Sequence, residues 1–228
     1  MKKELKYIGK NIPLSEAYFK VTGKLKFTGD MKLDSMLHCK LLLSTVAHAK
    51  IKKIDISEAL KFPGVVAIYT YLNTPKITYN TQVWNAIQKP VAEDQRIISD
   101  KARFVGDKIA AVVAENEESA KKATRLIKVE YEDLPAYFDP EEIIGKKEVN
   151  IHDIEEPFFR KKIECGNIEK GFQEADIVVE DRVVTPKLHH AAIENHICIA
   201  YPDDKGKITV LSPCQIPFAV RLIVGKVL

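Results

Sequence analysis

The stretch Lys108-Ile109-Ala110-Ala111-Val112-Val113-Ala114-Glu115 decides the fold of this 228-residue chain. Small and β-branched apolar residues without a polar break are typical of a strand that is buried on both faces. Residues 117–125 follow as a predicted helix, with acidic side chains in the first turn and basic ones nearer the end, as the helix dipole favours. Residues 127–132 then alternate apolar and charged side chains, which indicates a half-exposed strand.

The same order of strand, helix and strand is predicted for residues 49–70. Ser57 is the expected N-cap of the short helix, and Glu58 lies in its first turn. Pro63-Gly64 ends the helix, and residues 65–70 continue as a β-branched strand. An apolar run over residues 36–43 predicts a further buried strand ahead of this unit.

The remaining segments carry weaker patterns. Residues 72–100 contain the only tryptophan, Trp84, and are expected to form a long surface excursion of the kind that often contacts a partner. Residues 133–170 look like a domain boundary, because prolines and charges break any regular pattern. Further predicted elements are a strand at 175–184, a hairpin formed by 196–201 and 207–211, and a helix that opens at Pro217.

The composition limits the classes of protein to which this chain can belong. Hydrophobic residues make up 46% and charged residues 29%, as in an ordinary globular chain. The net charge of +3 is too balanced to indicate a nucleic-acid or membrane-surface partner. No apolar run approaches the roughly 18 residues that span a bilayer, and the basic N-terminus lacks a secretory apolar stretch. The four cysteines are far apart, which predicts free buried thiols and a cytoplasmic location.

The apolar end of the chain suggests that other protein surface covers it. Residues 218–228 would form a helix that is apolar nearly all round, and such a helix must be buried. Either a partner covers it or the chain is a piece of a longer protein, and we favour the second expectation.

No complete active site is visible from the residues alone. The cluster around His189, His190 and His196 has the wrong order for a zinc protease, so hydrogen-bonded histidines at strand ends are the favoured interpretation and no metal site is predicted. Cys165 and Cys214 are interpreted as structural, because a catalytic thiol needs a positioned base. Gly106 lacks the spaced glycines of a phosphate loop and is therefore interpreted as a turn residue.

An ordered series of motifs nevertheless resembles the large, molybdenum-binding subunit of the xanthine dehydrogenase/aldehyde oxidase family. The motifs keep the family order from about residue 11 to residue 228. They lie at residues 21–30, 36–38, 44–51, 55–59, 62–65, 90–92, 103–107, 110–115, 129–135, 166–172, 175–180, 190–194 and 215–217.

This resemblance implies an α+β fold, in which an α/β hammerhead domain is followed by the truncated start of a molybdopterin-binding domain. Members hydroxylate an aldehyde or an N-heterocycle carbon with oxygen derived from water. Their electrons pass to iron–sulfur clusters and FAD on partner subunits or domains, while the remaining C-terminal part of the large subunit completes the molybdenum site. The implied division is an N-terminal arm at 1–17, the hammerhead at 18–135, a linker at 136–169 and the incomplete molybdopterin-binding domain at 170–228.

One site residue follows from the resemblance. Gln215 matches a family glutamine whose amide can donate a hydrogen bond to an oxygen ligand of molybdenum, a contact that tunes the metal. The preceding Pro213-Cys214 departs from the family's small hydroxyl pair, and Leu188 stands where many relatives have glutamine. For Gln215 the alternative is a residue at a helix N-terminus that satisfies backbone groups. His190 and Glu194 match a motif that we interpret as structural.

The family's catalytic glutamate base lies beyond residue 228, so no catalytic residue is assigned here and the isolated chain is expected to be inactive. The alternative function is an orphan hammerhead module for binding or assembly without redox activity. A small-molecule hydrolase using Cys165 or Cys214 is a third and remote alternative, because it lacks an identifiable base and oxyanion partner.

Overall fold

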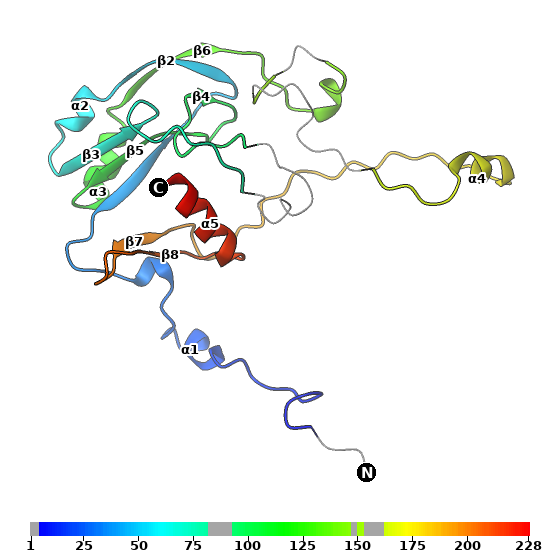
Figure 1. The fold of residues 1–228 in the computed structure, drawn as a ribbon, viewed down its shortest axis with the longest axis horizontal. Coiled ribbons are helices and arrows are strands. Elements are labelled where there is room, and N and C mark those ends of the chain that lie inside the picture. Colours follow the sequence, from blue (N-terminus) through cyan, green and yellow to red (C-terminus); the bar gives the residue numbers. More distant parts are fainter. Residues whose placement is uncertain (1–4, 82–92, 147–149, 153–161) are drawn as a thin grey trace. The chain divides into compact units, whose positions relative to one another are not determined.

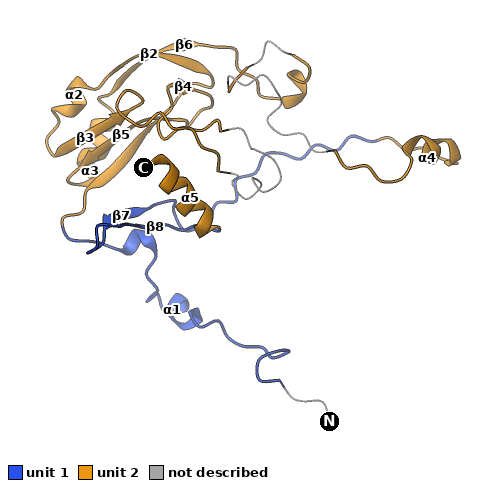
Figure 2. Cartoon of the chain, viewed as in Figure 1, with its two compact units in different colours: residues 1–34, 181–215 blue, residues 35–180, 216–228 orange. Residues whose placement is uncertain are grey.

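The computed structural model describes residues 5–81, 93–146, 150–152 and 162–228 (Figure 1). By contacts, the chain divides into two compact units (Figure 2). Unit 1 comprises residues 1–34 and 181–215, and unit 2 comprises residues 35–180 and 216–228.

The main body of unit 2 contains two antiparallel three-stranded sheets. One has the strand order β1-β5-β3 and the other the order β4-β2-β6. The strands are β1 (His38–Leu43), β2 (Ala49–Asp55), β3 (Val65–Thr70), β4 (Lys101–Ala102), β5 (Lys108–Ala114) and β6 (Lys128–Asp133).

The two predicted strand–helix–strand segments are confirmed as an order of elements. Helix α2 (Ser57–Leu60) follows β2 and precedes β3, and helix α3 (Glu117–Thr124) follows β5 and precedes β6 (Figure 1). In both cases the helix carries the chain from one sheet to the other, so the two strands that it joins do not pair with each other.

Strand β5 supplies both hydrophobic clusters of unit 2. Ala110 and Val112 pack in one cluster with residues of α2, β3 and α3, whereas Ile109 packs in the other with Ile51 and Ala102. Neighbouring side chains of a strand point to opposite faces, so one strand can serve two cores. The prediction of a strand buried on both faces is therefore confirmed.

The predicted helix at 117–125 is confirmed as α3. The side chain of Asn116 caps it, because its Oδ1 accepts a hydrogen bond from the Ser119 N–H at 2.8 Å. Glu117 and Glu118 occupy its first turn.

The short helix α2 begins differently from the prediction. Ser57 is its first residue, and Ile56 occupies the N-cap position. Asp55 explains the difference, because its Oδ1 accepts both the Ser57 N–H at 3.0 Å and the Ser57 hydroxyl at 2.7 Å. These hydrogen bonds also hold the pKa of Asp55 below its ordinary value. The helix ends before Pro63-Gly64, and Gly64 has a φ of +82°.

Two expectations about strands need correction. Strand β1 is not a continuously buried run, since half-buried and exposed side chains alternate along it. It lies at the edge of its sheet, where only one face is covered. Residues 175–184 form no strand and are exposed, because no described strand lies beside them to complete a hydrogen-bond ladder.

Residues 72–100 are only in part a surface excursion. Asn80, Ile98 and Ser99 are buried, and Tyr79 forms a backbone bridge with Gln95. Trp84 lies outside the described residues. The region after β6 contains the 3-10 helix η3 (Pro140–Glu142) and helix α4 (Ile168–Glu174).

Unit 1 contains helix α1 (Ala17–Val21), the 3-10 helix η1 (Thr28–Asp30) and the predicted hairpin. The hairpin is confirmed as β7 (Ile199–Pro202) paired with β8 (Ile208–Leu211). Its turn is held by Asp203, whose Oδ1 accepts the N–H groups of Lys205 and Lys207, each at 2.8 Å.

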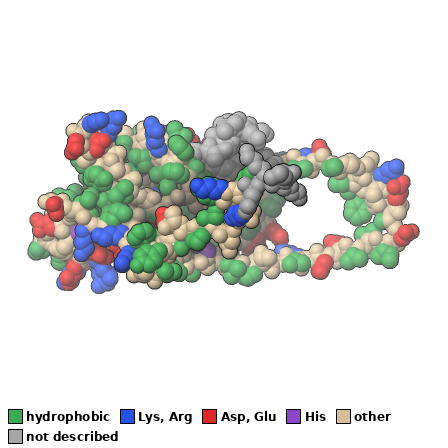
Figure 3. Space-filling view, turned by 90° about the horizontal axis from the view of Figure 1, so that it is seen from below, with side chains coloured by type: hydrophobic (Ala, Val, Ile, Leu, Met, Phe, Trp, Pro, Cys, Tyr) green, Lys and Arg blue, Asp and Glu red, His purple; other side chains and the backbone are tan. Residues whose placement is uncertain are grey.

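The final predicted helix is confirmed as α5 (Pro217–Val227), which belongs to unit 2. Ala219 and Val227 are buried, but Phe218 and Leu222 are 76% and 67% exposed. The helix is thus only partly covered within this chain. Figure 3 shows many further hydrophobic side chains on the visible surface. Among the described residues, no helix is long and apolar enough to cross a membrane.

Candidate functional site

Gln215 lies on the connection between β8 and α5, two residues before the first residue of the helix. Pro217 occupies the first turn of α5, where its fixed φ suits the helix and its missing N–H costs no hydrogen bond. The Gln215 side chain is exposed, and within the described part of the chain it makes no hydrogen bond. Its two amide N–H groups are therefore available to an acceptor outside these residues.

The histidine cluster shows no arrangement of metal ligands. The rings of His189 and His190 stack with their centroids 5.2 Å apart, and His189 Nδ1 accepts the N–H of Ala191 at 2.9 Å. Both histidines are exposed, while Glu194 is half-buried. Over the described ranges, no group of three or more His, Cys, Asp and Glu side chains could hold a metal ion.

The expectation of buried thiols is wrong. None of Cys39, Cys165, Cys198 and Cys214 forms a disulfide, and all four are exposed. The apolar character of a thiol is not enough to bury it. Cys39 lies on an edge strand, and the other three cysteines lie outside the two clusters of unit 2.

Gly106 is confirmed as a turn residue. It has a φ of +98°, and its N–H donates a 2.8 Å hydrogen bond to the carbonyl of Ser44. A residue with a side chain would be strained in this conformation.

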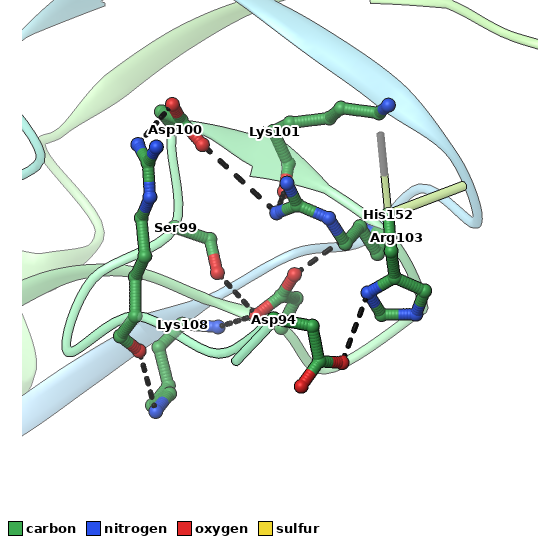
Figure 4. A network of polar contacts seen from close by, with 9 residues as sticks. Asp94, Ser99, Asp100, Lys101, Arg103, Lys108 and His152 are labelled. Atoms are coloured by element: carbon green, nitrogen blue, oxygen red, sulfur yellow. Dashed lines mark hydrogen bonds and ion pairs between the residues drawn. The ribbon is translucent and has the colours of Figure 1, made fainter. Parts of the chain in front are cut away.

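The structure shows a buried polar cluster before β5 that the sequence patterns did not indicate. Asp107 Oδ1 accepts the Ser99 hydroxyl at 2.6 Å and the Lys108 N–H at 2.9 Å, and its Oδ2 accepts the Arg103 N–H at 3.2 Å. Ser99, Arg103 and Lys108 are labelled in the close view of this region (Figure 4). Because every contact satisfies a polar group of the fold, we interpret the cluster as structural.

A second carboxylate, Asp94, lies in the same region. It is only 6% exposed, and its Oδ1 accepts Nδ2 of Asn80 at 3.0 Å while its Oδ2 lies 3.0 Å from Nδ1 of His152. In Figure 4 the side chains of Asp94 and His152 point toward each other. The preceding residue, Glu93, contacts Lys226 of α5. Long-range partners of this kind leave no periodic trace in a sequence, so only the structure could show them.

An open groove lies along α4. Its lining is apolar and includes Ile168 and Phe172 of the helix together with Ile177 and Val179. A groove without polar side chains offers no group for proton transfer or metal binding, so it is not the candidate site.

Comparison with known proteins defines the class. The family model described as aldehyde oxidase and xanthine dehydrogenase, a/b hammerhead domain, matches residues 22–135. The model of the molybdopterin cofactor-binding domain matches residues 151–228. The chain is thus an α+β polypeptide in which a hammerhead domain precedes part of a molybdopterin-binding domain. It belongs to the xanthine dehydrogenase/aldehyde oxidase family of molybdenum-binding subunits.

Individual relatives agree with this assignment. The chain is 32% identical over 216 residues to the xanthine dehydrogenase molybdenum-binding subunit of Escherichia coli O157:H7, covering 93% of this chain and 29% of that protein. It is 32% identical over 217 residues to the nicotinate dehydrogenase large molybdopterin subunit of Eubacterium barkeri, covering 95% of this chain and 49% of that protein. The chain therefore spans less than half the length of either relative.

The folds agree as well. The aldehyde oxidoreductase of Desulfovibrio gigas superposes with a TM-score of 0.83 at 29% identity, covering 94% of this chain and 25% of that one. Quinoline 2-oxidoreductase of Pseudomonas putida 86 gives a TM-score of 0.81 at 26% identity, covering 98% and 29%.

Proposed function

We propose that residues 1–228 are the hammerhead domain and the first part of the molybdopterin-binding domain of a molybdenum hydroxylase. The enzyme would hydroxylate an aldehyde or an N-heterocycle with oxygen derived from water. The observation that carries this proposal is the succession of two family matches along one chain, at residues 22–135 and 151–228. We place the hammerhead at 18–135 and the start of the second domain at 170, with an arm at 1–17 and a linker at 136–169.

The part played by this chain is binding and orientation. When bound, the molybdenum cofactor supplies the oxidation chemistry. Gln215 would donate an amide hydrogen bond to it, a role that its exposure and its lack of a partner among the described residues support. No residue among those described is assigned as the catalytic base, so residues 1–228 alone are expected to turn over no substrate.

Partners would complete the enzyme. We propose that electrons pass to iron–sulfur and FAD subunits, and that the C-terminal part of the large subunit supplies the rest of the molybdenum site. The names of two relatives, a xanthine dehydrogenase and a nicotinate dehydrogenase, support an N-heterocycle as substrate, and the aldehyde oxidoreductase of Desulfovibrio gigas supports an aldehyde. The partly exposed apolar helix α5 supports a further protein surface in the assembly.

The first test is the composition of the native complex. Size-exclusion chromatography coupled to mass and metal analysis should show this chain together with partner subunits and stoichiometric molybdenum. A chain that runs alone and free of metal would favour the orphan hammerhead module instead.

The second test concerns Gln215. Gln215→Ala in the assembled enzyme should slow hydroxylation by about 10- to 100-fold, the usual effect of losing a hydrogen bond next to a metal site. Molybdenum content should stay near normal. Gln173→Ala, which removes an exposed glutamine from α4, is the matched control and should leave the rate unchanged. Unchanged turnover in Gln215→Ala would remove this residue from the site.

A further inference from the structure

Two consecutive acidic residues bind segments that are far away in the sequence. Asp94 contacts His152, which lies next to the start of the molybdopterin-binding match at residue 151. Glu93 contacts Lys226, which lies near the C-terminal end of α5. One dipeptide of the hammerhead match therefore contacts both ends of the described molybdopterin-binding segment.

The Asp94 contact is well anchored. The carboxylate is almost completely buried, and Asn80 and His152 occupy its two oxygens at 3.0 Å each. A buried carboxylate whose hydrogen bonds are satisfied on both sides has little freedom to turn, because losing either partner would leave a polar group unpaired. Asn80 thus fixes Asp94, and Asp94 in turn fixes the side chain of His152.

The Glu93 contact is of a different kind. Glu93 and Lys226 are 133 positions apart, and the side chains are 49% and 40% exposed. An ion pair that is exposed in this way shifts an equilibrium by about five-fold at most. Such a pair contributes little to overall stability, but it selects one orientation of α5, which has few buried residues of its own.

We propose that Glu93 and Asp94 are positioning residues for the molybdopterin-binding segment, because they hold His152 and helix α5, near its two described ends, against the hammerhead. Fixing both ends of a segment at one point removes much of the freedom of the chain between them. Helix α5 lies within the molybdopterin-binding match, so its orientation belongs to the domain that would hold the cofactor. This inference rests on the proposed function.

Reversal of the charges tests the proposal in the assembled complex. Glu93→Lys and Lys226→Glu should each accelerate amide hydrogen exchange in α5 by up to about five-fold, and the double variant should restore the slow exchange. The matched control is the reversal of Glu118 and Lys122, an i,i+4 pair on α3 with a 2.6 Å contact. The control variants should leave exchange in α5 unchanged.

A spectroscopic measurement tests the link between the orientation of α5 and the molybdenum site. The single charge reversals should alter the electron paramagnetic resonance signal of Mo(V) and lower kcat more than they change KM, and the double variant should restore both. His152→Ala should loosen residues 150–152 in hydrogen exchange while α3 keeps its exchange rate.

The outcomes separate this inference from the proposed function. Unchanged exchange in α5 for both single variants overturns the anchoring. Faster exchange with an unchanged Mo(V) signal overturns the link between the orientation of α5 and the molybdenum site. A wild-type complex without molybdenum overturns the proposed function itself.

Discussion

The hydroxyl of Ser99 donates a 2.6 Å hydrogen bond to Oδ1 of Asp107, and both residues are buried. Asp107 stands immediately before β5, the central strand of its sheet, and it also accepts the backbone N–H groups of Arg103 and Lys108. One carboxylate therefore joins the segment ahead of β4 to the turn that leads into β5. The conformation of the turn that leads into the central strand therefore depends on Asp107.

Asp107→Ala should lower the free energy of unfolding by about 3 kcal/mol, because it leaves several buried donors without an acceptor. Asp107→Asn keeps one carbonyl oxygen and should cost roughly half as much. Urea unfolding of the subunit that carries these residues measures both values. Equal stability of the wild type and the alanine variant would show that water replaces the carboxylate.

Gly64→Ala should destabilise the turn between α2 and β3. The φ of +82° strains any residue with a side chain by about 1–2 kcal/mol. The new Cβ would also lie 3.3 Å from Oγ of Ser119. Gly171→Ala in α4 is the control, since its φ is not positive and nothing lies near the added atom. Thermal unfolding should show a lower melting temperature for Gly64→Ala only, and equal shifts for the two variants would contradict the argument.

Lys40→Gln should raise the pKa of Glu117. In the folded protein the Lys40 ammonium lies 2.7 Å from Glu117 and holds the pKa of that carboxyl below its ordinary value, first by a hydrogen bond and then by charge attraction. The contribution of this contact to stability is present above the ordinary pKa of a glutamate and is lost as the pH falls through the lowered value. Carbon-13 NMR titration measures the shift.

Glu118 supplies the internal control for that titration. Lys122 lies one turn further along α3 and lowers the pKa of Glu118 in the same way, first by a hydrogen bond and then by charge attraction, whereas Lys40 contacts Glu117. The pKa of Glu118 should therefore stay where it is in Lys40→Gln. A shift of both carboxyl groups would indicate a change of α3 as a whole.

Leu222→Asp should lower the yield of the assembled complex. Leu222 is 67% exposed in this chain and lies on the same helix face as Phe218. Two exposed apolar side chains on one face are suited to contact another protein surface in the assembly. A charge there would have to be desolvated when the complex forms. Arg221→Asp places the same charge at a polar position of α5 and should assemble normally. Co-purification of the partner subunits measures the yield, and full assembly of Leu222→Asp would show that this face stays exposed.

Local sequence determined much of the fold. The apolar run at 108–115 predicted the central strand β5, and the charge order at 117–125 predicted α3, because both patterns depend on side chains that are neighbours along one element. The two β runs at 196–201 and 207–211 likewise predicted the hairpin of β7 and β8. The ordered family motifs predicted the hammerhead and the molybdopterin-binding match that the comparisons show.

Tertiary structure decided the rest. The apolar residues at 175–184 predicted a strand, but a strand needs a partner to receive its backbone hydrogen bonds, and the described residues provide none beside it. The four cysteines are exposed because burial depends on which elements cover a residue rather than on its own hydrophobicity.

The same holds for the polar contacts of unit 2. The sequence by itself determined the positions of β5, α3 and the β7–β8 hairpin, since those choices are made among residues a few positions apart. Only the tertiary structure decided that Asp94 meets His152 and that Glu93 meets Lys226. Contacts between residues so far apart in the chain depend on how the whole chain closes its loops, and no local pattern carries that information.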